Sequence, residues 1–203
     1  MTRRPAAVVL VALVALAGCQ APTPTEPPPT RTTSAAAPSP TPSPSCTPEA
    51  GGASYPCTAA QYAAMKEKDA LYAEAEAVYS RMFQENIRIS RAGGVNAATA
   101  VMTETTAGRA LESVIAVFRS LKERGLRAQG EDPRMTVQRL PGLAKEGTEV
   151  TLLVCVDASR WAFYKGKELV SKGASAEDRI YFGHSGGALK MLYVEGRRVE
   201  SCD

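Results

Sequence analysis

The sequence predicts an α+β fold, with helices in the first half of the domain and antiparallel strands in the second. Apolar residues recur at helical spacing between residues 59 and 124. After Gly130 the spacing changes to the alternation of a half-buried strand, and short glycine and proline turns separate the alternating segments. Helices followed by a run of strands are typical of the α+β class.

The N-terminus has the features of a secretory signal peptide. Arg3 and Arg4 precede an uncharged apolar run, residues 6–17, which is well short of the roughly 20 residues that span a bilayer. The segment Leu16-Ala17-Gly18-Cys19 resembles the lipobox of bacterial lipoproteins, in which the signal is cut before the cysteine and that cysteine carries lipid. We therefore expect removal of residues 1–18 and an extracytoplasmic protein, anchored to the outer face of the cell membrane by lipid on Cys19. The alternative is an ordinary signal peptide in which Cys19 has no role.

Residues 19–45 consist almost entirely of Pro, Thr, Ser and Ala after the first cysteine. Such a composition cannot bury enough apolar surface to fold, and its prolines favour an extended chain. We expect a disordered stalk that holds a single domain, residues 46–203, away from the membrane. The net charge of the chain is only +3, and no basic stripe is interleaved with aromatic residues, which argues against nucleic-acid binding.

Four cysteines remain when Cys19 is assigned to lipid, and three pairings of them are possible. An even set of cysteines in an exported chain is a disulfide framework more often than a metal site. We favour Cys46–Cys57 and Cys155–Cys202 because the members of each pair fall within one structural neighbourhood.

Two helices are expected before the strands. The first runs from about Ala59 to Ile89, because Thr58 and Gln61 form a capping box at its start and two glycines, at 93 and 94, follow its end. The second begins at Arg109, and Gly125 is its C-cap. The segment between them, residues 95–108, is compatible with a short helix or a loop.

The second half of the domain contains a series of alternating segments. Glycine, proline or lysine-glycine turns separate them. The expected strands are Arg134–Leu140, Glu149–Ala158, Arg160–Tyr164, Glu168–Val170, Asp178–Gly183, Leu189–Val194 and Arg197–Cys202.

One short motif matches a catalytic pattern. Residues 183–187 read Gly-His-Ser-Gly-Gly and fit G-x-S-x-G, which requires a strand, a sharp turn and a helix, with a separate histidine as base. Here an alternating segment follows, and His184 is the single histidine of the chain. A hairpin turn explains these glycines. We expect no catalytic residue, no metal site and no cofactor, because zinc-ligand spacings and phosphate-binding loops are missing from the sequence.

The layout of the chain resembles that of actinobacterial lipoproteins with an NTF2-like (SnoaL-like) domain. The shared features are the lipobox, the Pro/Thr/Ser stalk, the long helices, a strand that ends in Cys155-Val156-Asp157, and Cys202 at the extreme C-terminus. The resemblance implies a strongly curved antiparallel sheet that wraps against the helices and leaves a conical cavity. It also implies a disulfide between Cys155 and Cys202.

Four aromatic residues are candidates for lining such a cavity: Tyr72, Tyr79, Phe118 and Trp161. The tyrosines lie at helical spacing, and the alternative for them is simple packing of a helix on a sheet. The alternative for Trp161 is that it covers a sheet edge. Asp157, at a strand end, cannot be assigned to the cavity from the sequence.

The expected function is a non-catalytic binding or accessory module of the cell envelope, with a small apolar ligand or an envelope protein as its partner. Two alternatives remain open, because the NTF2-like fold does not decide function. One is an interaction scaffold whose cavity is filled with side chains. The other is an enzyme that uses acidic or tyrosine groups in the cone.

Overall fold

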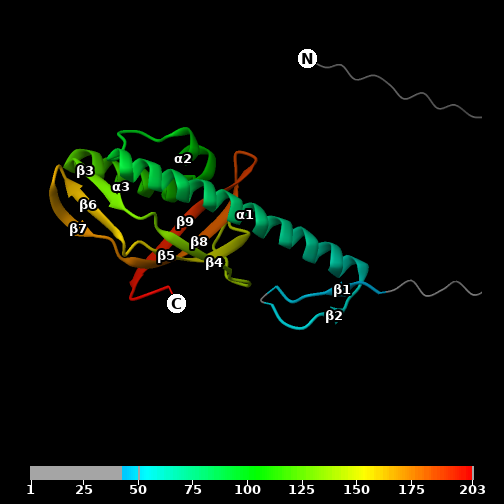
Figure 1. Cartoon of the computed structure of the whole chain (residues 1–203). Helices are drawn as coiled ribbons and strands as arrows, with labels where there is room; N and C mark the ends of the chain where they lie inside the picture. The colour runs from blue at the N-terminus through cyan, green and yellow to red at the C-terminus, as the bar shows by residue number, and fades with distance from the viewer. Residues whose placement is uncertain (1–42, 50, 203) are drawn as a thin grey trace, which may run out of the picture. The chain divides into compact units, whose positions relative to one another are not determined.

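The computed structural model describes residues 43–49 and 51–202, which belong to one compact unit (Figure 1). The expected signal peptide, Cys19 and most of the expected stalk lie outside the described residues. The stalk was expected to reach residue 45, but Ser45 already belongs to the folded unit. There β1 (Ser45–Cys46) pairs with β2 (Tyr55–Pro56). No helix in the described part of the chain is both long and apolar enough to cross a membrane.

The long helix α1 (Ala59–Ala92) begins at the predicted capping box. The Thr58 side chain accepts a hydrogen bond from the Gln61 backbone N–H, and the Gln61 side chain accepts one from the Thr58 backbone N–H. The helix is three residues longer than expected and ends at Gly93, whose φ of 88° is in the left-handed region.

Two shorter helices follow, α2 (Ala100–Thr105) and α3 (Gly108–Arg124). The ambiguous segment therefore contains a short helix, and α3 starts one residue before the expected position. Gly94 allows α1 and α3 to approach closely: a β-carbon there would lie 2.2 Å from the Phe118 carbonyl oxygen, and its φ is +85°.

Apart from the β1–β2 pair, the strands form two separately hydrogen-bonded antiparallel sheets rather than one continuous sheet. The three-stranded sheet has the order β3-β6-β7, and the four-stranded sheet has the order β4-β5-β8-β9. Their bounds are β3 (Leu126–Gly130), β4 (Arg134–Arg139), β5 (Val150–Asp157), β6 (Trp161–Lys165), β7 (Glu168–Lys172), β8 (Ser175–Ser185) and β9 (Ala188–Val199). The α+β class is confirmed.

The strand predictions were incomplete in two places. Strand β3 was not predicted, although Leu126 and Ala128 alternate as buried residues within it. Strands β8 and β9 are longer than expected, and Arg197 lies within β9 rather than in a separate C-terminal strand. Residues 195–198 of β9 are exposed, so no apolar alternation marks this part of the strand.

The chain crosses between the two sheets three times, after β3, after β5 and after β7. At the crossing after β7 the Gly173 backbone N–H donates to the Trp161 carbonyl oxygen at 2.8 Å. A β-carbon at Gly173 would lie 2.0 Å from the Ala158 carbonyl oxygen, so the crossings after β5 and after β7 pass within van der Waals contact of each other. They lie close together at one end of the four-stranded sheet.

Helix α1 lies across the strands (Figure 1) and contributes one wall of the core. The most deeply buried side chains come from α1, α2, β5, β8 and β9 and include Met82, Met102, Leu152, Phe182 and Leu189. Burial of side chains of this size contributes about 1.5–3 kcal/mol each, so this cluster is the main stabilising contact between helices and sheet.

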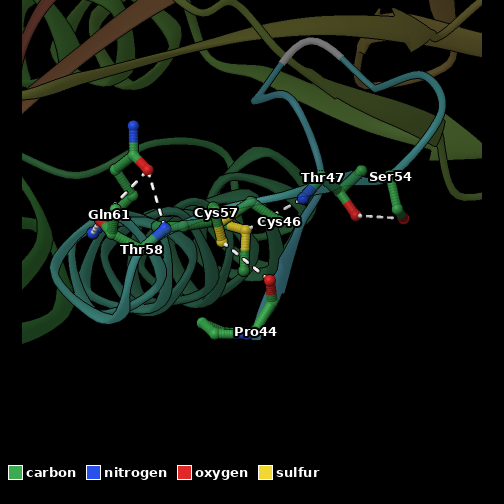
Figure 2. Close-up of a disulfide and its surroundings, with 8 residues drawn as sticks. Pro44, Cys46, Thr47, Ser54, Cys57, Thr58 and Gln61 are labelled. Atoms are coloured by element: carbon green, nitrogen blue, oxygen red, sulfur yellow. Dashed lines mark hydrogen bonds between the residues drawn. A yellow bond between two sulfur atoms is a disulfide. The ribbon is translucent and has the colours of Figure 1, made fainter. Parts of the chain in front are cut away.

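Both favoured disulfides are present. Cys46–Cys57 closes the short loop before the first turn of α1 (Figure 2). Cys155–Cys202 joins β5 to the C-terminal residues. The two bonds thus attach both ends of the described chain to the rest of the domain.

Candidate functional site

A cavity of about 440 Å³ lies beside the crossings between the sheets. The second half of α1 forms one side, and the other sides come from the end of β5, from β6, from the β7–β8 connection and from the start of β8. Its size falls within the range typical of small-molecule sites.

Two pairs of aromatic side chains line this cavity from different elements. Tyr79 and Phe83 are one turn apart on α1, with ring centroids at 6.1 Å. Trp161 and Phe163 alternate on β6 and meet edge to face, also at 6.1 Å. Because both pairs face the same space, the cavity has aromatic walls on the helix side and on the sheet side.

Two polar atoms in this lining are buried and unpaired. Within the described residues, the Asn86 amide oxygen and the Trp161 indole nitrogen are the buried side-chain atoms that have no hydrogen-bond partner. Both residues line the cavity, and Trp161 is only 7 % exposed. Buried polar atoms are nearly always paired in folded proteins, so two exceptions in one cavity indicate a place for ligand groups.

Asp178 on β8 adds a half-buried carboxylate to the same lining. No hydrogen bond or ion pair joins this carboxylate to any other residue among 43–49 and 51–202. Removal from water raises the pKa of Asp178. Burial, together with the charge of Asp178, also raises the pKa of the Tyr79 hydroxyl, which places the two groups in one electrostatic environment.

The four aromatic candidates from the sequence divide into two groups. Tyr79 and Trp161 line the cavity. Tyr72 is buried elsewhere along α1, with the Arg139 guanidinium 4.9 Å from its ring centroid. Phe118 is buried in the core on α3 and does not line the cavity. Two of the four candidates therefore border this cavity, and the other two are buried away from it.

The residues of the G-x-S-x-G motif lie away from this cavity. Ser185 ends β8, and the chain continues through a turn into β9 rather than into a helix. His184 belongs to β8 rather than to the expected hairpin turn. Its Nδ1 lies 2.6 Å from a Glu149 carboxylate oxygen. Asp157 is also outside the cavity lining and accepts hydrogen bonds from the Ser159 backbone and the Ser175 hydroxyl.

Asn86 and Asp178 were not predicted from the sequence, although each breaks an apolar pattern. Asn86 follows Tyr79 by seven residues and therefore lies on the same face of α1. Asp178 occupies an inward position of β8, on the same face of the strand as Ala176 and Ile180. A polar residue at an inward position was the available signal. Across residues 43–49 and 51–202, no three His, Cys, Asp or Glu side chains are grouped so as to hold a metal ion.

Comparisons with known proteins give little similarity. No family model matches the sequence, and no curated protein matches it. One solved structure, the intermembrane space region of the chloroplast protein ARC6, aligns with a TM-score of 0.43 and 16 % sequence identity. The alignment covers 63 % of this chain and 95 % of that one.

Proposed function

We propose that this protein is an envelope lipoprotein whose domain binds a small molecule in the cavity between α1 and the two sheets. The observation that carries the proposal is the combination of apolar walls with unpaired polar atoms around one space of about 440 Å³. Ligand sites are typically concave and mostly apolar, with a few polar groups that orient the ligand.

The fold proposed for this domain is the NTF2-like cone. Its support is a long helix lying across antiparallel strands, with the cavity on the side where helix and strands face each other. The two sheets with crossings between them correspond to a strongly bent strand layer, which is what a cone requires.

The proposed location is the outer face of the cell membrane. The lipobox and the Pro/Thr/Ser segment support a lipid anchor, and two disulfides suit an oxidising compartment. Replacement of Cys19 by alanine should release the protein from membranes or leave an uncut precursor, as measured by membrane fractionation and intact mass. A processed and membrane-bound C19A variant would contradict the anchor.

The ligand proposal can be tested by native mass spectrometry of the full chain purified from its host envelope in mild detergent. We expect a small molecule that remains bound in the native spectrum and is lost on denaturation. Repeated detection of the unliganded mass alone would contradict small-molecule binding and favour the scaffold alternative. That alternative expects a filled cavity, which is harder to reconcile with the volume given above.

A second candidate function is acid–base catalysis, and the proximity of Asp178 to Tyr79 favours it. A carboxylate whose pKa is raised is suited to act as a general base. The same purification separates the two functions: a bound molecule recovered unchanged after prolonged incubation supports a binding module, and its conversion to a product supports an enzyme.

A further inference from the structure

We propose that the cavity binds an organic cation, an amphipathic molecule whose protonated amine pairs with the Asp178 carboxylate while its apolar part lies between the aromatic side chains. This inference rests on the proposed function, because it names the ligand class for the same cavity. Three features carry it: the unpaired carboxylate, the aromatic walls and the unpaired amide oxygen.

The Asp178 carboxylate has no counter-ion within the described part of the chain. A carboxylate that loses water without gaining a partner is unfavourable, and a cation at hydrogen-bond distance removes that cost. The neighbouring strand leaves space for this group, because a β-carbon at Gly196 would come within 2.2 Å of Asp178 Oδ1. The domain therefore holds an acidic group in the cavity without neutralising it.

The aromatic walls suit a cation as well as an apolar chain. Tyr79 and Phe83 border the cavity from α1, and Trp161 and Phe163 border it from β6. Ammonium groups are attracted to the faces of aromatic rings, most strongly to tryptophan, and the attraction increases when water is excluded. A carboxylate next to aromatic rings thus favours a positively charged group over a neutral one.

The unpaired amide oxygen of Asn86 provides a second acceptor in the same lining. A primary or secondary ammonium carries more than one N–H and can donate both to this oxygen and to Asp178. The indole N–H of Trp161 is the remaining unpaired atom, and it can donate to an oxygen of the ligand. These donors and acceptors match an amine that also carries a hydroxyl, ether or carbonyl oxygen.

Two cationic residues contribute to the edge of the cavity, and both are exposed. Lys172 pairs with Ala162, which alternates with the cavity-lining Trp161 and Phe163, so the Lys172 side chain lies on the opposite face of its sheet. Arg198 pairs with Ala176 and lies on the cavity face. Because Arg198 is solvated, its charge is screened and acts on the cavity less strongly than that of half-buried Asp178.

The single tryptophan of the chain makes the test direct, because Trp161 fluorescence reports on the cavity alone. The protein used for the titrations consists of residues 19–203 with Cys19→Ser. It carries no lipid and needs no detergent. Three probes of equal chain length are titrated at neutral pH: octylammonium, 1-octanol and octanoate. Calorimetry on the same samples gives the affinities independently of the fluorescence change.

We expect octylammonium to bind about tenfold or more tightly than 1-octanol, as charge-assisted hydrogen bonds to a desolvated carboxylate predict. Asp178→Asn keeps the shape of the side chain and should abolish this preference by weakening the binding of octylammonium. The matched control is Glu177→Gln on the same strand. Glu177 bonds to Arg197 at 2.7 Å and does not line the cavity, so this variant should retain the preference.

Other outcomes overturn the inference in distinguishable ways. Equal binding of octylammonium and octanol, or an undiminished preference in D178N, would leave the cavity as a ligand site but exclude Asp178 as its counter-ion. Tightest binding of octanoate, lost in Arg198→Gln, would show that the ligand is an anion. If none of the three probes binds by either method, the proposed function fails together with the inference.

Discussion

Two neighbouring rows of side chains on helix α1 have opposite environments. The core row, Ala75, Met82 and Ile89, is at most 1 % exposed and packs against α2 and the four-stranded sheet. The cavity row, Tyr79, Phe83 and Asn86, borders the space of about 440 Å³. Tyr79 and Phe83 are buried like the core row and Asn86 is half-buried, so the two rows differ mainly in what they face.

Polar groups distinguish the two rows more clearly than burial does. Near the core row, the buried Thr105 and Thr106 hydroxyls each donate to a backbone carbonyl oxygen at 2.6 Å. Near the cavity row, Asn86 Oδ1, Trp161 Nε1 and the Asp178 carboxylate have no such partner among the described residues. Satisfied polar groups indicate a structural core, and unsatisfied ones beside an open space indicate a binding site.

The largest expected effect separates the two regions by stability. Phe182 is fully buried in the core. Its replacement by alanine should lower the free energy of unfolding by about 3–5 kcal/mol. Phe163→Ala at the cavity should cost less than half as much, because this half-buried ring already faces space. Urea denaturation followed by far-UV circular dichroism measures both. Equal losses would mean that the cavity is packed like the core.

The next effect concerns the cavity end of the four-stranded sheet. Cys155 precedes Val156, which lines the cavity, and its bond to Cys202 closes a loop across 47 residues. Replacing both cysteines with alanine should reduce stability by about 2–4 kcal/mol through loss of the constraint on the unfolded chain.

The matched control is the double alanine variant of Cys46 and Cys57. That bond closes a loop across only 11 residues, so its loss should cost about 1 kcal/mol less on the same model. A larger loss from the shorter loop would show that native contacts, rather than loop length, determine the contribution of each bond.

A smaller effect, of opposite sign, is expected from Asp178→Asn. Burial raises the folded-state pKa of Asp178 above its unfolded value, so the ionised group destabilises the domain at neutral pH. Its unfavourable contribution disappears as the pH falls through the folded-state pKa. D178N should therefore have a Tm a few degrees higher than the unliganded wild type at pH 7, and the difference should vanish in acid.

The difference in stability between the wild type and D178N isolates the effect of Asp178 from that of other titrating groups. Tyr79 and Arg198 face it from α1 and β9 and are identical in both. Carboxyls whose pKa is lowered, such as Glu85 and Glu149, lose their stabilising contribution in acid in both proteins alike. A D178N variant that is less stable at pH 7 would show that the carboxylate has a partner in solution.

The smallest effect on stability is expected from Gly196→Ala. Its β-carbon would displace Asp178 Oδ1, which is the end of a side chain and can move. The domain should keep its Tm within a few degrees, yet lose part of its preference for octylammonium over octanol. Unchanged preference in G196A would mean that the position of the carboxylate is not set by this glycine.

The sequence alone determined the elements whose signals are local. The capping box at Thr58, the glycine C-caps at Gly93 and Gly125 and the strand β4 depend on neighbouring residues, so they could be predicted from spacing. The two disulfide pairings also followed from the arrangement of expected elements along the chain. Strand β3 was not found in this way, because only Leu126 and Ala128 are apolar in it and it follows the C-cap Gly125 directly.

Only the tertiary structure decided which buried residues face the cavity. Tyr72 and Tyr79 are seven residues apart and lie on the same face of α1, about 10 Å apart along its axis. Tyr72 lies beneath Arg139, whereas Tyr79 borders the cavity. Helical periodicity specifies the direction of a side chain around the axis. Whether that side chain meets packed core or the cavity depends on strands that are distant in the sequence. Here it depends on where the chain crosses between the two sheets.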